Sequence, residues 1–229
     1  MAVRPVCLIT GASAGIGAAC AIQAAHAGYD IVINYNKDRA GADKVADAAR
    51  HAGARALVLQ ADVADPDAIT AMFDALDAEF CRLDALINNA GIVGPAVRVT
   101  ELTHDRLRRL FDVNVIGAIL VARAAVQRME PARSGVIVNL SSVAARLGSA
   151  NQYVDYAATK GAIDTFTKGL ADEVAPHGIR VVGVAPGVID TDIHAKGGQP
   201  DRAARLAPTL PMGRVGTADE VANAVLWLM

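Results

Sequence analysis

The sequence predicts an α/β fold in which helices cover both faces of a doubly wound parallel sheet. Apolar runs rich in Val and Ile alternate with stretches of helical period along nearly the whole chain, as in repeated βαβ units. Most of these runs are continuously apolar, which is typical of strands buried on both faces. The chain has 229 residues, 53% of them apolar and 20% charged, and no linker or repeat divides it. We therefore expect a single domain over residues 1–229.

Six strands are expected, in chain order Val6–Thr10, Asp30–Asn34, Ala56–Gln60, Leu83–Asn88, Gly135–Leu140 and Ile179–Val184. Helices fill the intervals, and the first of them runs to about Ala27. Another begins where Asp65 precedes Pro66, because a carboxylate caps free N–H groups and proline suits the first helical position. Thr217 and Glu220 form a capping box at the start of the last helix.

Two long helices and one irregular segment complete the expected fold. The helices lie near Leu107–Met129 and Ala157–Ala175. Asn114 and Arg123 interrupt the apolar stretch around residues 115–122 of the first helix, so no targeting or membrane-spanning segment is expected. The segment Asp190–Val215 contains three prolines and predicts a flap over a pocket, although an ordinary surface loop is the alternative.

Charge and cysteine content narrow the class of partner. Twenty-two basic and 24 acidic side chains leave a formal net charge of −2, without the basic excess typical of nucleic-acid or anionic-membrane binding. A small-molecule substrate is therefore expected, with no nucleic-acid or membrane partner. Cys7, Cys20 and Cys81 are scattered and odd in number, which is typical of reduced thiols in a cytoplasmic protein, and no spacing indicates a metal site.

A glycine-rich turn separates the first strand from the first helix. Residues 10–17 read TGASAGIG. Glycines allow a sharp turn and a close approach to a pyrophosphate, whose charge the free N–H groups of the following helix would meet. A tight turn without a ligand is the alternative, but strand, glycines and helix stand in the order that a dinucleotide site needs.

Further motifs follow along the chain: Asp62-Val63 after the third strand, Asn88-Asn89-Ala90-Gly91 after the fourth, then Asn114, Ser142, Tyr156-x-x-x-Lys160 and Pro186-Gly187-Val188-Ile189-Asp190-Thr191. Together with the G-x-x-x-G-x-G spacing of the turn, these motifs resemble the short-chain dehydrogenase/reductase family over residues 10–191. The resemblance implies a Rossmann-like fold, a nicotinamide dinucleotide cofactor and oxidoreductase activity on an alcohol or a carbonyl compound.

The resemblance also implies which residues contact the cofactor. Asp62 and Val63 would lie against the adenine, residues 89–91 near a ribose, and Thr191 near the nicotinamide amide. A loop cap at Asp62 and a plain turn at residues 88–91 are the alternatives. The full expected set is Gly11, Ser13, Ala14, Gly15, Ile16, Gly17, Tyr35, Asn36, Lys37, Asp62, Val63, Asn89, Ala90, Gly91, Tyr156, Lys160, Pro186, Gly187, Ile189 and Thr191.

The end of the second strand bears on the choice between NAD and NADP. An acidic residue there would bind the ribose 2′-hydroxyl and repel a 2′-phosphate. Tyr35 occupies the expected position, and Lys37 and Arg39 follow closely, so the sequence favours NADP. NAD stays an alternative, because Ala14 stands where many NADP-using relatives carry a basic residue and because the two cations would also suit a solvated loop.

Tyr156 and Lys160 stand four residues apart on an expected helix, hence on one face. In isolation this spacing is typical of an aromatic ring packed under a lysine stem. Beside a cofactor turn it predicts general acid/base chemistry, since hydride transfer on carbon requires proton transfer on oxygen. An ammonium about 4–5 Å from the phenol would contribute up to about 3–4 kcal/mol towards lowering its pKa from about 10, neglecting burial.

Ser142 and Asn114 complete the expected catalytic set with Tyr156 and Lys160. Ser142 would hydrogen-bond the substrate oxygen, whereas the neighbouring Ser141 would point to the other side of a continued strand. Asn114 resembles the asparagine with which relatives hold a water that links the lysine to solvent. The alternative for Asn114 is a hydrogen bond to a backbone carbonyl.

The expected activity is interconversion of a secondary alcohol and a ketone, most similar to that of 3-oxoacyl-carrier-protein reductases. Glucose 1-dehydrogenase activity is one alternative, and a non-catalytic dinucleotide sensor or an adenosyl-dependent methyltransferase is another. Relatives usually form homotetramers through the two long helices. They also continue past the position of Met229 into a seventh strand that is absent from this sequence.

Overall fold

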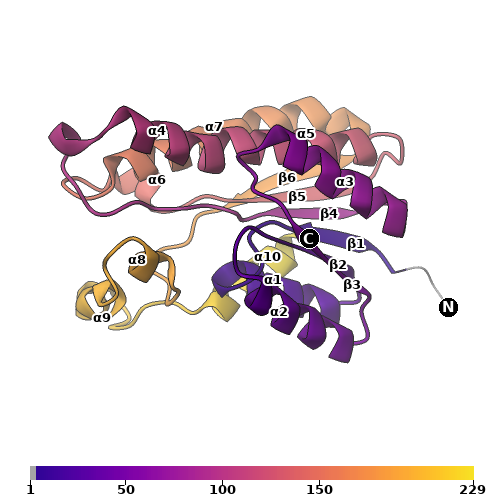
Figure 1. The fold of residues 1–229 in the computed structure, drawn as a ribbon, viewed down its shortest axis with the longest axis horizontal. Helices are drawn as coiled ribbons and strands as arrows, with labels where there is room; N and C mark the ends of the chain where they lie inside the picture. Colours follow the sequence, from indigo (N-terminus) through magenta and orange to yellow (C-terminus); the bar gives the residue numbers. More distant parts are fainter. Residues whose placement is uncertain (1–3) are drawn as a thin grey trace.

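The computed structural model describes residues 4–229, except for the side chains of His194 and Lys196. The described residues form one parallel sheet with the strand order β3-β2-β1-β4-β5-β6 (Figure 1). The chain winds outward from β1 to β3 and then returns to the other side of β1, as expected for a doubly wound sheet. The strands are β1 Val6–Ile9, β2 Asp30–Tyr35, β3 Ala56–Gln60, β4 Ala85–Asn88, β5 Gly135–Leu140 and β6 Ile179–Val184.

All six predicted strands are confirmed, with ends that differ by two residues at most. β2 extends by one residue to include Tyr35, and β4 begins at Ala85 instead of Leu83. The N-cap at Asp65 is confirmed, since its carboxylate accepts the backbone N–H of Asp67 at 2.9 Å. The capping box of Thr217 and Glu220 is also present.

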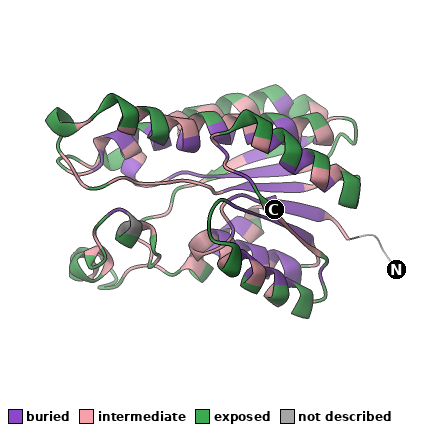
Figure 2. Ribbon diagram, in the orientation of Figure 1, coloured by how far each residue is buried: buried purple, intermediate pink, exposed green. Residues whose placement is uncertain are grey.

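Helices cover both faces of the sheet, with α1, α2 and α10 on one face and α3, α4, α5 and α7 on the other (Figure 1). Helix residues that face the strands are buried, and those on the outer surface are exposed (Figure 2). The helices are α1 Gly15–His26, α2 Arg39–His51, α3 Pro66–Phe80, α4 His104–Phe111, α5 Ala118–Met129, α6 Ala144–Leu147, α7 Val154–Val174, α8 Ile193–Lys196, α9 Arg202–Leu206 and α10 Ala218–Leu228.

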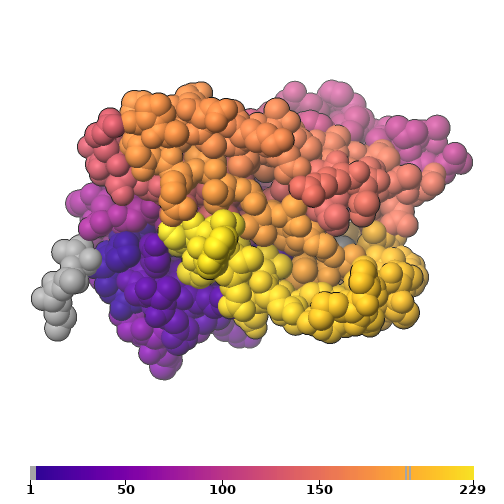
Figure 3. Space-filling view, turned by 180° about the vertical axis from the view of Figure 1, so that it is seen from behind, coloured from indigo at the N-terminus to yellow at the C-terminus, as the bar shows by residue number. Residues whose placement is uncertain are grey.

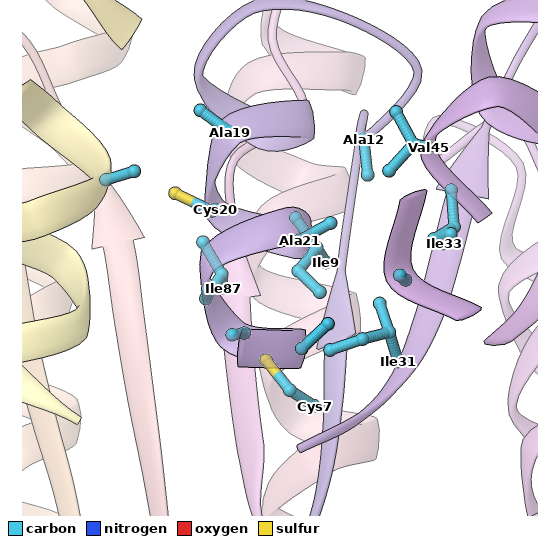
Figure 4. Close-up of a cluster of buried hydrophobic side chains, with 14 of the residues drawn as sticks. Cys7, Ile9, Ala12, Ala19, Cys20, Ala21, Ile31, Ile33, Val45 and Ile87 are labelled. Carbon is cyan, nitrogen blue, oxygen red and sulfur yellow. The ribbon is translucent and has the colours of Figure 1, made fainter. Parts of the chain in front are cut away.

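Alternate residues of the central strands supply the two halves of the core. On the face of α1, Cys7 and Ile9 of β1 pack with Cys20 and Ala21 of α1 (Figure 4). The small side chains of α1 allow this helix to lie close to the strands, which positions its N-terminus just beyond the carboxyl end of β1. On the opposite face, Leu8 packs with larger side chains such as Phe73 and Leu76.

A turn of π-helix, Asp112–Gly117, joins α4 and α5 where the sequence predicted one continuous helix. Asn114 lies inside this turn. The whole segment His104–Met129 is long and apolar enough to cross a membrane by length and composition alone. Half of its most apolar window is buried, and Val121 and Ala125 pack in the core, so packing against the sheet accounts for its apolar character.

The segment predicted as a flap contains α8, α9 and a 3₁₀ turn at Ala207–Thr209. It begins and ends at a bridge between Ile189 and Gly216, where Asp190 N–H donates to the Gly216 carbonyl at 2.9 Å. The segment lies beyond the carboxyl ends of the strands (Figure 1) and forms the lower part of one end of the molecule in the space-filling view (Figure 3).

Candidate active site

A cavity of about 910 Å³ lies at the carboxyl ends of the strands, between the glycine turn, α7 and the flap. This volume is near the upper end of the range for small-molecule sites. The predicted cofactor residues that line it are Gly11, Ser13, Ala14, Gly15, Ile16, Asn36, Lys37, Asp62, Val63, Asn89, Ala90, Gly91, Tyr156, Pro186, Gly187, Ile189 and Thr191. Ser142 lines it too, so residues from after every strand meet in one place.

The glycine turn is held from the neighbouring strand. The buried hydroxyl of Thr10 accepts the backbone N–H groups of Asn89 and Ala90 at 2.9 and 3.0 Å. The Asn89 amide in turn donates to the carbonyls of Thr10 and Gly11 at 2.8 and 3.1 Å. The two motifs therefore form a single hydrogen-bonded unit that positions the start of α1.

Two glycines of the turn have positive φ angles, +64° at Gly11 and +57° at Gly15, which favour glycine over other residues. Gly17 acts differently and does not line the cavity. A Cβ at Gly17 would lie 2.5 Å from the Gly11 carbonyl oxygen and from the Asn89 amide nitrogen, so close packing excludes a side chain there.

The start of α1 suits an anionic ligand such as the pyrophosphate of a dinucleotide. Ala14 at its N-cap offers no side-chain acceptor, and the first turn contains no acidic residue. The free N–H groups and the positive end of the helix dipole are thus not neutralised by the chain itself. The turn, the uncapped helix and the size of the cavity together fit a dinucleotide.

The end of β2 differs from the expectation at one residue. Tyr35 is 3% exposed, packs in the core and does not line the cavity, because the extra strand residue places its side chain on the core face. We therefore leave Tyr35 out of the candidate site. Arg39 is also directed elsewhere, since it pairs with Asp43 at 2.9 Å. Lys37 is the cation of this segment that lines the cavity.

Two carboxylates line the same end of the cavity, and both have partners within the chain. Asp38 caps α2 by accepting the N–H of Gly41 at 2.9 Å. Asp62 accepts the N–H of Ala64 at 3.0 Å and pairs with Arg109 at 2.8 Å. Partial burial raises the pKa of Asp62, but hydrogen bonds from Ala64 and Arg109 outweigh it and hold this pKa below its ordinary value.

Tyr156 and Ser142 both line the cavity, and their hydroxyls are hydrogen-bonded to each other. Burial raises the pKa of Tyr156 above its ordinary value, and a hydrogen bond with the Ser142 hydroxyl lowers it in part. The expectation that Lys160 would lower this pKa is therefore not met in the protein alone, because the cost of burying the charged phenolate is larger. Ser141 is directed away, as expected, and donates to the Lys160 carbonyl at 3.3 Å.

Lys160 lies beneath the ring of Tyr156, with its ammonium nitrogen 5.7 Å from the ring centroid. That nitrogen donates to the Leu140 carbonyl at 2.7 Å. The side chain is 5% exposed, and burial lowers the pKa of Lys160 to about 8. Lys160 is therefore a buried cation at neutral pH that loses its proton above about pH 8. It lies close to the phenol but outside the residues that line the cavity.

Asn114 is buried and hydrogen-bonded at both ends of its amide. Its oxygen accepts the Ile92 N–H at 2.8 Å, and its nitrogen donates to the Ile92 carbonyl at 2.9 Å and to the Thr159 hydroxyl at 3.2 Å. These contacts match the alternative of bonding to backbone. They join the π turn, the loop after β4 and α7 immediately beside Lys160.

Sequence reasoning missed an ion pair that supports the start of α7. Arg106 of α4 donates to the buried Asp155 carboxylate at 2.6 Å. The other oxygen of Asp155 accepts the Tyr156 N–H at 2.9 Å. The position of Asp155 next to Tyr156 was a signal, but no spacing rule could join it to an arginine 49 residues away. The flap residue Arg202 also lines the cavity and was not predicted.

Comparison with known proteins gives consistent matches over nearly the whole chain. A family model described as enoyl-(acyl carrier protein) reductase matches residues 11–229. An uncharacterised oxidoreductase of Escherichia coli K12 is 48% identical, over 98% of this chain and 92% of that protein. The cis-4-hydroxycyclohexanecarboxylate dehydrogenase of Sinomonas cyclohexanicum is 41% identical, over 97% of this chain and 88% of that protein.

Solved structures agree with these matches. A short-chain type dehydrogenase/reductase from Mycobacterium marinum has a TM-score of 0.92 and 33% identity, over 98% of this chain and 87% of that chain. The 3-ketoacyl-(acyl-carrier-protein) reductase of Brucella melitensis, solved as a complex with NADH, has a TM-score of 0.90 and 32% identity, over 98% of this chain and 90% of that chain.

Proposed function

Because the chain belongs to the short-chain dehydrogenase/reductase family, whose members here are named oxidoreductases and dehydrogenases, we propose that it interconverts a secondary alcohol and a ketone with NADP. Tyr156 is the general acid and base of this reaction. The observation that carries the proposal is that Tyr156, with Ser142 beside it and Lys160 beneath its ring, lines the cavity that the uncapped start of α1 also borders.

The dinucleotide would be held along the carboxyl edge of the sheet. The backbone of residues 13–16 at the start of α1 meets the pyrophosphate, with residues 186–189 and Thr191 across the cavity. Asp62 and Val63 lie against the adenine, and residues 89–91 lie near a ribose. The bound nicotinamide supplies or accepts the hydride.

The chain's own residues then handle the proton. A raised pKa keeps the Tyr156 phenol protonated at neutral pH, so it is ready to donate a proton to the carbonyl oxygen during reduction. Ser142 hydrogen-bonds the same oxygen and the phenol, which stabilises negative charge as it develops. The Lys160 ammonium, 5.7 Å from the ring centroid, favours the phenolate that is left behind. Asn114 is a positioning residue, because it holds the loop after β4 beside Lys160.

The preference for NADP rests on the end of β2. Lys37 lines the cavity there, whereas the nearest carboxylate, Asp38, is engaged as the cap of α2. Among the described residues Lys37 forms no ion pair, and a cation there without an unengaged carboxylate favours a 2′-phosphate over a 2′-hydroxyl. NAD is the alternative, and the 3-ketoacyl reductase of similar structure was solved with NADH.

A 3-oxoacyl compound is the proposed substrate class, with a sugar such as glucose as the alternative. The named relatives act on different molecules, which include a hydroxycyclohexane carboxylate. We also propose a cytoplasmic location and a homotetramer assembled through the faces of α4, α5 and α7. Light scattering on the purified protein tests the tetramer.

The decisive experiment follows NADPH and NADH absorbance with acetoacetyl-CoA, 4-oxocyclohexanecarboxylate and, in the reverse direction, glucose. We expect turnover by the wild type and a loss of about 100- to 10,000-fold in Tyr156→Phe. Cofactor binding, followed by fluorescence, separates the rival functions. Binding without turnover of any substrate would indicate a sensor, and absence of binding would overturn the proposal.

A further inference from the structure

The flap side of the cavity carries a cation and a phenol that the proposed chemistry does not use. Arg202 of α9 and Tyr153, the residue that precedes α7, both line the cavity together with Tyr156. The guanidinium carbon of Arg202 lies 5.0 Å from the centroid of the Tyr153 ring. This cation–π contact holds the guanidinium over the phenol ring.

The hydrogen bonds of Arg202 leave one edge of its guanidinium without a partner. Its Nη1 donates to the side-chain oxygens of Gln152 and Gln199, two neutral groups. Its Nε is buried and has no hydrogen-bond partner within the described residues. The hydroxyl of Tyr153 is also buried and also has no partner among them. Buried donors without acceptors cost free energy and are rare in folded proteins, so each calls for an explanation.

The charge balance of the cavity singles out Arg202 further. Arg109 lines the cavity but pairs with Asp62 at 2.8 Å, and Lys37 lies at the end of β2, among the residues assigned to the adenosine half. Within residues 4–229, apart from the two undescribed side chains, Arg202 forms no ion pair. Asp192 also lines the cavity, but it forms no ion pair with Arg202 among the described side chains.

We propose that the substrate carries an oxyanion, either a carboxylate or a phosphate, which Arg202 and the hydroxyl of Tyr153 bind. The Nε edge of a guanidinium donates two parallel hydrogen bonds to a carboxylate or a phosphate, and this is the edge that the described residues leave without acceptors. Apolar residues such as Val143, Leu147 and Leu206 line the same region and suit an apolar substrate body. This inference rests on the proposed function, since it assigns the specificity of the same site.

The two sources of the oxyanion are separated by two pairs of probes. The first pair is 4-oxocyclohexanecarboxylate and its uncharged methyl ester. The second is acetoacetyl-CoA, which carries phosphates, and the uncharged N-acetylcysteamine thioester of acetoacetate. For each pair, the ratio of kcat/KM for the anion to that for the neutral analogue measures the contribution of the charge.

Arg202→Gln removes the charge and keeps a hydrogen-bonding side chain. Arg205→Gln is the matched control, because Arg205 lies on the same short helix, bonds Gln199 at 3.0 Å and does not line the cavity. We expect Arg202→Gln to lower the anion-to-neutral ratio by about 10- to 100-fold for one pair of probes, through the loss of a charge-assisted bond. Arg205→Gln should leave this ratio unchanged.

The pair that responds identifies the source as a carboxylate or a phosphate. An equal fall in kcat/KM for the anion and its neutral analogue would overturn the proposal, because it would mean that Arg202 only supports the flap. Equal wild-type use of anion and neutral analogue in both pairs would overturn it as well. Should Arg202→Gln fail to fold, Tyr153→Phe keeps the stacked ring, removes the hydroxyl and should lower the same ratio.

Failure of the proposed function would be distinguishable from failure of this inference. If the wild type oxidises NADPH with none of the probes, calorimetry would measure the binding of 4-oxocyclohexanecarboxylate and of coenzyme A to the wild type and to Arg202→Gln. Binding that Arg202→Gln weakens at least about tenfold, as expected for one charge-assisted bond, would support the inference. Equal binding by both proteins, or none, would overturn it.

Discussion

The glycine turn and α7 border the same cavity but offer it different kinds of group. The start of α1 presents backbone N–H groups that no side chain caps, and the hydrogen bonds that hold the turn are satisfied within the chain. α7 presents Tyr156 and buries Lys160, two titratable side chains whose pKa values burial shifts away from their ordinary range. Cofactor binding at the start of α1 should therefore depend little on pH, whereas proton transfer at α7 should depend on it strongly.

The difference also has an energetic side. A helix end without a cap costs little, because a ligand or water can satisfy its donors. A buried ammonium costs stability at every pH where it stays charged. At Tyr156 and Lys160 of α7, function and stability should therefore oppose each other. The variants below test this from the largest expected effect to the smallest.

Lys160→Met should have the largest effect. We expect kcat to fall by up to about 100- to 1000-fold, because the cation that favours the Tyr156 phenolate is lost. The variant should nevertheless unfold at the same or a higher temperature at pH 7. Relief of the buried charge contributes up to about 3 kcal/mol, offset by the Leu140 carbonyl that loses its partner. Kinetics and thermal unfolding measure the two effects.

The pH dependence of unfolding checks the cause of that result. The pKa of Lys160 is about 8 in the folded protein, below the ordinary lysine value of 10.5. The unfolded chain therefore binds more protons between these values, so the free energy of unfolding contributed by this group should rise with pH across that window. Lys160→Met should lose this rise. If Lys160→Met unfolds at a lower temperature and keeps the rise of stability with pH, the cost assigned to burying the Lys160 ammonium is wrong.

Ala14→Asp should weaken cofactor binding at the start of α1, because it adds a helix cap and a negative charge where the chain has neither. We expect dissociation constants for NADPH and NADH to rise by about 100-fold, through repulsion of the pyrophosphate and loss of free N–H groups. Stability should rise by about 0.5–1 kcal/mol, as for other N-caps. Ala14→Asn adds the cap without the charge and should give a smaller loss of affinity. Unchanged affinity in both variants would exclude the start of α1 as the pyrophosphate site.

Turnover and binding should separate when pH is varied. Between pH 7 and 9.5 we expect the dissociation constant of NADPH to stay nearly constant. The rate of carbonyl reduction should fall above about pH 8, because Lys160 loses its proton there and Tyr156 becomes a weaker acid in consequence. Stopped-flow kinetics and fluorescence titration measure the two quantities. Parallel changes in the reduction rate and in the dissociation constant would mean that the start of α1 and α7 do not differ in pH dependence as proposed.

Lys37→Ala removes a single exposed positive charge that lines the cavity at the end of β2. We expect NADPH to bind about tenfold more weakly, since one charge-assisted bond to the 2′-phosphate is lost, while NADH binding stays unchanged. Arg39→Ala is a suitable control, because Arg39 pairs with Asp43 and does not line the cavity. Equal loss of affinity for the two cofactors would argue against NADP preference.

The fold could be predicted from the sequence because its signals are local. Apolar runs located each strand to within two residues, and the caps at Asp65 and Thr217 marked helix starts. The π turn at Asn114 was missed, because its side chain bonds Ile92, which lies 22 residues away. Neither hydrophobic period nor propensity contains such a contact.

The candidate site was predicted well where motifs follow strand ends and poorly where burial decides. Placing Tyr35 near the cofactor ignored one extra strand residue, which turns its ring into the core. Expecting a lowered pKa for Tyr156 counted the charge of Lys160 and left out desolvation, which is the larger effect. Arg202 reaches the cavity through the fold of the flap, and no local pattern marks it.

Thr217→Ala should have the smallest effect and supplies the opposite case to Ala14. α10 packs against α1, but its first turn is capped by Thr217 and Glu220. Arg214 and the Thr217 N–H hold the pKa of Glu220 at about 2, so its contribution should be present above pH 4.5 and be lost as pH falls towards 2. We expect Thr217→Ala to cost about 1 kcal/mol by chemical unfolding.

The same variant should leave cofactor affinity and kcat at their wild-type values, because Thr217 does not line the cavity. A loss of NADPH affinity in Thr217→Ala would mean that the cap of α10 also shapes the cavity, through the bridge between Ile189 and Gly216 that precedes Thr217. An unchanged affinity with lower stability would show that the cap of α10 serves the fold alone, in contrast to the uncapped start of α1 that borders the cavity.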